Sequence, residues 1–212
     1  MRIIILGAPG AGKGTQAGYI GARLGIPAIS TGNIFREVIA SGSELGETLR
    51  RYIDAGQLVP DGIVMDAIKH RLEQPDCAGG FILDGFPRTL AQAQALDEMG
   101  VTIDAVVDIE VPDDEIIGRM GGRRVCPCGA SYHIRYNPPR RSGRCDACGD
   151  VLSMRADDAP DTVKARLRVY HSQTESLKAY YRDRGTYVTV IGQDDPADTR
   201  ALTMAALGIE TD

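Results

Sequence analysis

The stretch GAPGAGKGTQ, which begins at Gly7, carries the residue types that bind phosphate groups. Gly12 and Lys13 complete the pattern G-x-x-x-x-G-K, in which glycines let backbone N–H groups converge on an anion and the lysine adds a full charge. A Ser or Thr that binds Mg²⁺ normally follows, whereas here Gly14 follows and the hydroxyl comes one position later, at Thr15. Glycine-rich turns open many helices without a ligand, but this turn directly follows a strand-like run. We therefore predict phosphate binding, and the question becomes what holds the metal.

The stretch LDGFPRT, residues 83–89, follows another apolar run and offers a carboxylate and an arginine. Side chains at the carboxyl end of a strand in an open α/β sheet lie where ligands bind. Asp84 could hold Mg²⁺ through water, because Mg²⁺ keeps much of its hydration shell. Arg88 could clamp a phosphate with its planar fork. Asp-Gly and Phe-Pro are also ordinary turn signals, so this stretch supports phosphate chemistry only together with the glycine loop.

Arginines gather near the glycine loop and near two polar segments of this acidic chain. Phosphoryl transfer requires cations that position the transferring group and offset its charge, and little covalent chemistry. Any single arginine could equally be a solvated surface residue. The candidates are Arg36, Arg88, Arg119, Arg123, Arg155 and Arg166.

Four of the five cysteines cluster in the sequence as two close pairs, each followed by a glycine. Two such pairs predict a site in which four thiolates bind zinc and thereby fold the surrounding segment. The alternative is a set of buried reduced thiols, but the segment has few large aliphatic residues to bury them. The predicted ligands are Cys126, Cys128, Cys145 and Cys148, and Cys77 is expected to be an ordinary thiol.

Length and composition limit the classes of protein. The chain has 212 residues with 43% hydrophobic content, which is enough for one sizeable core. Its formal net charge of −5 argues against a protein that binds nucleic acid over its whole surface. No apolar run is long enough to span a membrane, and the N-terminus lacks the features of a secretory signal. We expect a cytoplasmic protein.

The elements that must position these side chains follow from the apolar runs. Continuous β-branched runs predict buried parallel strands at 2–6, 81–84, 105–111 and 187–191. Helices are expected at 13–24, from a cap at Asp61, and over 161–184, where apolar residues recur every three or four positions. Strands alternating with helices predict a doubly wound α/β fold with a parallel sheet.

Two segments interrupt the alternation and are predicted to be lobes inserted into the core. Residues 30–59 are polar and mostly helical, and residues 122–158 are rich in Gly, Pro, Cys and Arg. The second segment cannot build its own hydrophobic core, so it needs the metal. The predicted core consists of residues 1–29, 60–121 and 159–212.

Several blocks in one order resemble the adenylate kinases, in their bacterial form with a long zinc-containing lid. The resemblance rests on GAPGAGKGTQA (7–17), STGNIFR (30–36), AGQLVPD (55–61), LDGFPRTLAQAQAL (83–96), GRRVCPCGASYH (122–133), GRCDACG (143–149), RADD (155–158) and TVKARL (162–167). In this family Gly and then Thr normally follow the lysine, so the irregular phosphate loop is a mark of the family.

The resemblance implies reversible, Mg²⁺-dependent phosphoryl transfer in which ATP and AMP give two ADP. It implies ATP contacts from Gly10, Ala11, Gly12, Lys13, Gly14, Thr15, Arg119, Arg123, Ser131, Tyr132 and Asp194. It implies AMP contacts from Thr31, Arg36, Gln57, Leu58, Val59, Gly85, Phe86, Pro87, Arg88, Gln92, Arg155 and Arg166. It implies catalytic roles for Lys13, Asp84, Arg88, Arg123, Arg155 and Arg166. Because Gly14 supplies no hydroxyl, Mg²⁺ would be bound by the ATP phosphates, water and Asp84, with Thr15 as a nearby helper. Residues 30–59 would close over AMP and residues 122–158 over ATP, and the family suggests a monomer.

One departure from the family concerns the first cysteine pair, which is usually separated by two residues. Here only Pro127 lies between Cys126 and Cys128, so the turn is tighter. Asp146 or His133 is the expected substitute if one thiolate does not reach the metal.

Other functions remain open from sequence alone. A kinase acting on UMP or CMP would share the phosphate loop and the DGFPR block, although Thr31, Gln92 and the cysteine lid favour AMP, and GTP as donor is a further variant. A GTP-binding switch normally carries an N-K-x-D motif, which the sequence lacks. A zinc-ribbon ATPase that binds nucleic acid is suggested by the basic cysteine segment, but the net charge counts against it.

Overall fold

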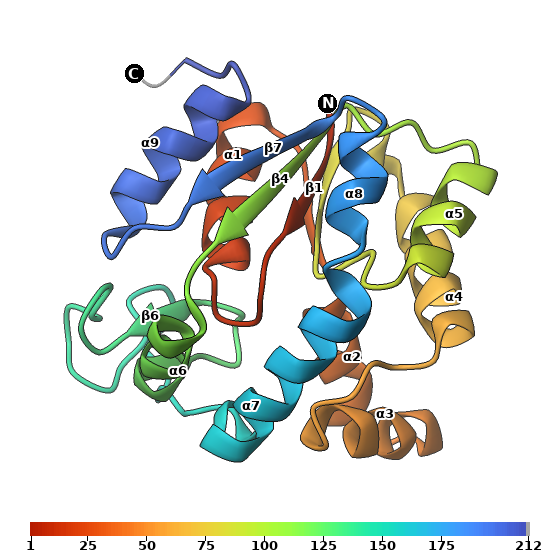
Figure 1. Ribbon diagram of the computed structural model, residues 1–212. Helices are drawn as coiled ribbons and strands as arrows, with labels where there is room; N and C mark the ends of the chain where they lie inside the picture. Colours follow the sequence, from red (N-terminus) through yellow and green to blue (C-terminus); the bar gives the residue numbers. More distant parts are fainter. Residues whose placement is uncertain (211–212) are drawn as a thin grey trace.

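A computed structural model describes residues 1–210 and has a five-stranded parallel sheet at its centre, with strand order β2-β3-β1-β4-β7 (Figure 1). The strands are β1 (Arg2–Leu6), β2 (Ala28–Ser30), β3 (Phe81–Asp84), β4 (Ala105–Glu110) and β7 (Tyr187–Ile191). The four predicted strands are confirmed. The short edge strand β2 was missed, and β4 ends one residue earlier than predicted.

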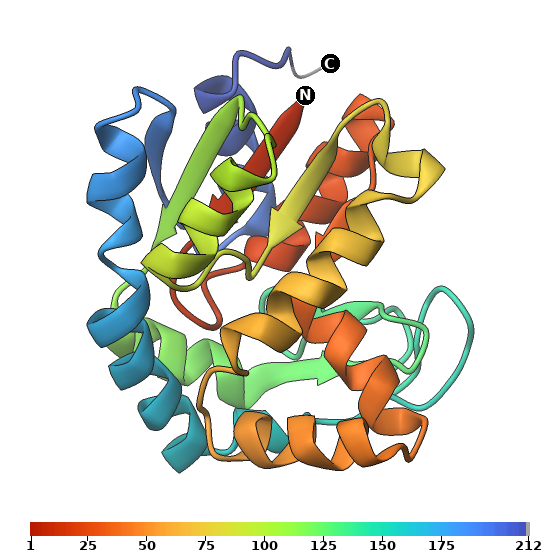
Figure 2. The same cartoon turned by 90° about the vertical axis from the view of Figure 1, so that its right-hand side faces the viewer.

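Helices cover both faces of the sheet, which agrees with the predicted doubly wound α/β fold (Figure 2). One face packs against α1 (Lys13–Leu24) and α9 (Pro196–Ala206), through Ile20 and Met204. The other face packs against α4 (Asp61–Leu72), α5 (Leu90–Glu98) and α8 (Leu177–Arg182), through residues such as Ile68, Leu96 and Leu177. Within the part of the chain that the structure describes, no helix has the length and apolar character needed to cross a membrane.

The helix predicted over 161–184 is wrong as one continuous α-helix. It consists of α7 (Pro160–Val169), a π-helical turn (Tyr170–Thr174) and α8. In the π turn the N–H of Glu175 donates to the carbonyl of Tyr170 at 3.0 Å. The wider turn places the buried Thr174 so that its hydroxyl donates to the carbonyl of Arg88 at 2.9 Å. The helix thereby contacts the loop that carries a predicted phosphate ligand.

Asp61 does not cap α4 as predicted. Pro60 occupies the N-cap position, and Asp61 is the first helical residue. Its carboxylate instead accepts hydrogen bonds from two residues at the start of α5, Thr89 and Gln92.

Both polar segments lie beyond the edge of the sheet that is formed by the carboxyl ends of the strands (Figure 1). The first contains α2 (Thr31–Ala40) and α3 (Glu44–Asp54), and the Ser43 side chain caps α3 by accepting from the N–H of Gly46. The second follows α6 (Asp113–Gly122) and contains an antiparallel pair, β5 (Arg123–Val125) and β6 (Ser131–His133). Its buried cluster consists only of Cys126, Cys145 and Leu152. This small cluster agrees with the expectation that residues 122–158 do not form an ordinary hydrophobic core.

Candidate functional site

The phosphate loop joins β1 to α1 through backbone conformations that favour glycine. Gly10 and Gly12 have φ angles of 87° and 95°, in the left-handed region that residues with a Cβ rarely adopt. Lys13 is the first residue of α1, and its ammonium donates to the carbonyls of Gly7 and Ala8, both at 2.8 Å. The lysine side chain therefore folds back over the loop, where its charge and the N-terminus of the helix act on the same anion.

Lys13 is buried near the carboxylate of Asp84 and near several arginines. Its burial lowers its pKa to about 8, Asp84 opposes the shift, and the nearby Arg88 and Arg166 contribute to it. A bound phosphate would restore the preference for the charged form, because an anion close to an ammonium favours protonation.

Asp84 is the last residue of β3, and its carboxylate lies beside the start of α1. β3 pairs with β1 so that Ile5 is opposite Asp84. A Cβ atom added to Gly14 would lie 3.1 Å from Asp84 Oδ2, closer than ordinary van der Waals contact. Gly14 therefore lets the carboxylate approach the phosphate loop, which favours Asp84 as the group that binds hydrated Mg²⁺ near the phosphates.

Two cavities meet at the phosphate loop. The first is lined by every residue that the resemblance assigns to ATP: Gly10, Ala11, Gly12, Lys13, Gly14, Thr15, Arg119, Arg123, Ser131, Tyr132 and Asp194. The second is lined by most residues assigned to AMP: Thr31, Arg36, Gln57, Leu58, Val59, Gly85, Pro87, Arg88, Gln92 and Arg166. Arg155 lines the first cavity instead, and Phe86 lines neither because its side chain is fully buried in the core. Lys13, Arg36, Arg88 and Arg166 line both cavities.

Two aspartates that sequence reasoning missed hold the arginines at this junction. Arg123 donates from Nε to Asp158 at 2.8 Å and from Nη2 to the second oxygen of the same carboxylate. Arg166 donates to Asp157 at 2.7 Å. Burial opposes ionisation of Asp157, but Arg166 and the other arginines lower its pKa below the usual range. The RADD block, residues 155–158, was the sequence signal that contained these aspartates. It supported the family resemblance but did not indicate the ion pairs.

The remaining cations are more available to a ligand. Arg155 Nε is buried and has no hydrogen-bond partner within residues 1–210. Burial lowers the pKa of both Arg155 and Arg88 to about 10, and neighbouring arginines contribute to the shift, so both stay positively charged at neutral pH. The unpaired Nε–H of Arg155, close to other arginines, fits an anionic ligand, because a buried donor without a partner is costly.

Arg119 forms the far wall of the first cavity. It donates to Glu115 at 3.2 Å and to the carbonyl of Gln193 at 3.1 Å, and Asp194 lies 3.7 Å away. Its guanidinium also lies 5.9 Å from the centroid of the Tyr136 ring. This flat, cationic wall suits a nucleobase, and Tyr136 was not identified from the sequence because no motif contains it.

The backbone of the DGFPR block connects the second cavity to the sheet. Thr31 donates its hydroxyl hydrogen to the carbonyl of Gly85 at 2.9 Å, and Arg88 donates to the same carbonyl from Nε at 2.8 Å. Arg36 donates to Asn33 at 2.7 Å. Both guanidinium groups are thereby positioned on the cavity wall and keep further donors for a phosphate.

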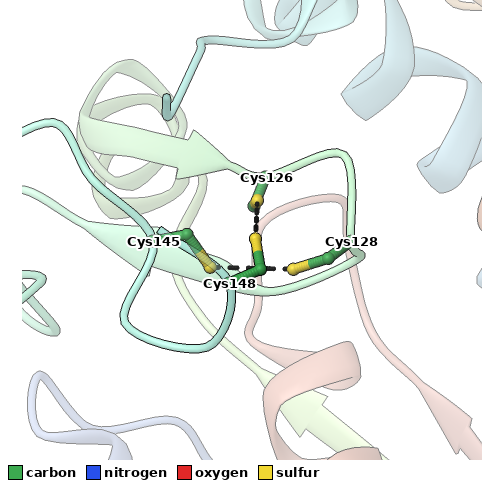
Figure 3. A group of neighbouring side chains, drawn as sticks. All are labelled: Cys126, Cys128, Cys145 and Cys148. Carbon is green, nitrogen blue, oxygen red and sulfur yellow. Dashed lines mark hydrogen bonds between the residues drawn. The ribbon is translucent and has the colours of Figure 1, made fainter. Parts of the chain in front are cut away.

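The four clustered cysteines point toward one another from two loops of the lobe formed by residues 122–158 (Figure 3). Their sulfur atoms all lie within 4.8 Å of one another. Four sulfurs arranged tetrahedrally at about 2.3 Å from zinc would be about 3.8 Å apart, so this group fits the metal. The shortened pair, Cys126 and Cys128, therefore brings both sulfurs to the cluster despite its tighter turn.

Neither suggested substitute ligand belongs to the cluster. The Asp146 carboxylate accepts from the N–H of Arg140, and His133 Nδ1 accepts from the N–H groups of Arg135 and Tyr136. The additional polar group at the cluster is Tyr132, whose hydroxyl lies 3.5 Å from Cys145 Sγ and accepts from the N–H of Asp146 at 2.8 Å.

Comparison with known families agrees with this geometry, because the model of the adenylate kinase family matches residues 5–186. This chain belongs to the adenylate kinase family. It is 55% identical to an adenylate kinase of Caldicellulosiruptor saccharolyticus, with 99% of this chain and 100% of the relative covered. It is 52% identical to an adenylate kinase of Streptomyces griseus, with coverage of 98% and 97%, and 55% identical to one of Moorella thermoacetica, with 97% of each covered. The resemblance drawn from the sequence blocks is confirmed.

Proposed function

We propose that this adenylate kinase transfers a phosphoryl group from ATP in the first cavity to AMP in the second, reversibly, with two ADP as products. The observation that supports this assignment is that two cavities share one group of cations. Lys13, Arg36, Arg88 and Arg166 line both. A donor and an acceptor in these cavities would bring their phosphates together between those side chains.

Charge and alignment explain how the site would accelerate the reaction. Two polyanions repel each other, and the cations offset that repulsion while holding donor and acceptor in line. Arg123, Arg155 and Arg166 would contact the transferring group, and Lys13 the β- and γ-phosphates. Mg²⁺, when bound with ATP near Asp84 and Thr15, supplies charge neutralisation between the phosphates.

The lobes formed by residues 30–59 and 122–158 would close over AMP and ATP, respectively. Closure excludes water, which would otherwise hydrolyse ATP. Arg36 from the first lobe already lies close enough to Arg123 and Arg166 that these arginines lower its pKa, although burial is the larger cause. The lobes therefore contribute charges to one site.

We further propose that the lid, residues 122–158, binds structural zinc through its four cysteines. The closeness of the sulfurs and the small buried cluster around them support the proposal. We propose a cytoplasmic monomer whose ligands are ATP, AMP and ADP rather than nucleic acid or a membrane.

A substrate panel and one matched pair of variants test the acceptor and donor assignments. In a coupled assay with ATP as donor, AMP should give faster turnover than CMP or UMP. With AMP as acceptor, ATP should give faster turnover than GTP. Arg88→Ala should lower kcat/KM for AMP about 30-fold or more, because it removes a guanidinium assigned to the AMP phosphate, and loss of a buried charged contact costs about 2–5 kcal/mol. Arg50→Ala, an exposed control on α3, should not. Faster turnover with CMP, or equal effects of the two substitutions, would overturn the assignment.

A further inference from the structure

A buried hydrogen-bond network fixes the side chain of Gln92, on α5 at the edge of the second cavity. Gln92 is 2% exposed. Its Nε2 donates to Asp61 Oδ1 at 2.7 Å, and its Oε1 accepts from the N–H of Arg88 at 2.7 Å. The second oxygen of Asp61 accepts from the Thr89 hydroxyl at 3.2 Å. Asp61 thus contacts two residues in the first turn of a neighbouring helix.

The chemistry of the two partners determines which way the Gln92 amide points. An ionised carboxylate only accepts hydrogen bonds, and a backbone N–H only donates. Nitrogen must therefore face Asp61 and oxygen must face Arg88. The usual ambiguity between the oxygen and the nitrogen of a glutamine amide does not arise here, because the reversed amide would place two donors together and two acceptors together.

The amide keeps one donor and one acceptor for a ligand. A primary amide has two N–H groups and two lone pairs, and the network uses one of each. A 6-aminopurine presents an amino donor beside a ring-nitrogen acceptor, whereas a 6-oxopurine presents a carbonyl acceptor beside a ring N–H donor. These edges have opposite order, so an amide of fixed orientation complements only one of them when the phosphate holds the base in place.

We propose that Asp61 is the positioning residue that makes the acceptor site select a 6-aminopurine over a 6-oxopurine, by fixing the orientation of the Gln92 amide. The inference rests on the proposed function, in which Gln92 contacts the AMP base. Without the Asp61 oxygen, Nε2 loses its fixed acceptor and only the Arg88 N–H opposes rotation of the amide. Asp61 itself lines neither cavity.

The test measures kcat and KM for AMP and for IMP, a 6-oxopurine nucleotide, at saturating ATP. Asp61→Leu removes the acceptor while keeping a similar side-chain shape. It should raise KM for AMP and lower the AMP-to-IMP ratio of kcat/KM about tenfold or more, because a mismatched buried hydrogen bond is the source of such discrimination. Asp61→Asn retains an oxygen acceptor and should restore most of the ratio. Asp66→Leu, the same substitution at an exposed position of α4, is the matched control and should keep the wild-type ratio.

The outcomes separate the inference from the proposed function. An AMP-to-IMP ratio that Asp61→Leu leaves at the wild-type value overturns the role of Asp61. Equal losses in Asp61→Leu and Asp66→Leu overturn it as well, because they indicate a general effect of the substitution. A wild-type enzyme that does not prefer AMP overturns the acceptor assignment and the inference together. If Asp61→Leu does not fold, Asp61→Ala replaces it in the same comparison.

Discussion

Removing the metal from the lid should unfold residues 122–158 while the core stays folded. The perturbation is a strong zinc chelator or Cys128→Ser, which removes one exposed ligand. Cys77→Ser is the matched control, because Cys77 is a buried thiol that contacts Arg71 and Asp76 and not the cluster.

The size of the effect follows from how little else holds the lid. Its buried cluster contains Cys126, Cys145 and Leu152, with Ala130 and Tyr132 packed against it. Burial of one leucine contributes about 1.5–3 kcal/mol, whereas a structural zinc site contributes about 10–16 kcal/mol at neutral pH. The two large clusters of the core contain no residue from the lid, so their packing does not depend on it.

Hydrogen exchange measures the two regions separately. After chelation, protection of lid amides should fall by about 10³-fold or more, equivalent to about 4 kcal/mol, while amides of β1 and β4 change by less than about tenfold. Turnover should fall in parallel and return when zinc is restored. Cys77→Ser should leave lid protection unchanged.

The result that refutes this reasoning is a metal-free protein with full lid protection and full turnover. It would show that contacts other than zinc coordination hold the lid. Metal analysis of the purified protein is the necessary companion, since a folded, active protein without stoichiometric zinc would lead to the same conclusion.

Three further predictions concern side chains around the first cavity. Tyr132→Phe removes a hydrogen bond to a predicted zinc ligand and should weaken zinc retention about 10- to 100-fold in chelator competition. The control Tyr136→Phe should retain zinc like the wild type, and equal retention by both variants would contradict the role of the Tyr132 hydroxyl. ATP binding should weaken as pH rises through about 8, because Lys13 carries its charge below its lowered pKa and loses it above. Calorimetry in buffers of different ionisation heat should show proton uptake on ATP binding near this pH. A constant affinity for ATP up to about pH 9.5 would contradict this role of Lys13. Gly122→Ala would overlap the His133 ring and should raise KM for ATP; an unchanged KM would show that the ring moves freely.

Much of the fold was predictable because its strands are local signals. Continuous apolar, β-branched runs predicted four of the five strands, all except β2. The strand Ala28–Ser30 has only three residues, and its pairing with β3 is a long-range contact that no local pattern indicates. The π turn at Tyr170–Thr174 was missed for a related reason. Apolar residues recur across it at helical spacing, while the wider turn follows from packing and from the bond between Thr174 and Arg88.

The candidate site divides in the same way. Glycines, Lys13 and the cysteines belong to short motifs, so their chemistry is visible in the sequence. The carboxylates that orient the functional groups could not be identified from the sequence, because the role of each depends on a partner that is distant along the chain. Asp158 lies 35 positions from Arg123, and Asp61 lies 31 positions from Gln92. An aspartate at a helix start predicts a cap, and only the fold shows that Asp61 contacts another helix instead.

Gly14 connects the sequence irregularity to the chemistry of the metal. A phosphate loop with Ser or Thr directly after the lysine places the metal's hydroxyl ligand on the loop itself. Here Asp84 approaches so closely that even a Cβ at position 14 would crowd its carboxylate. A side chain at position 14 would therefore require the Asp84 carboxylate to shift by a few tenths of an ångström. Gly14 thus lets the Asp84 carboxylate lie against the phosphate loop without that shift, and Gly14→Ser should displace the carboxylate.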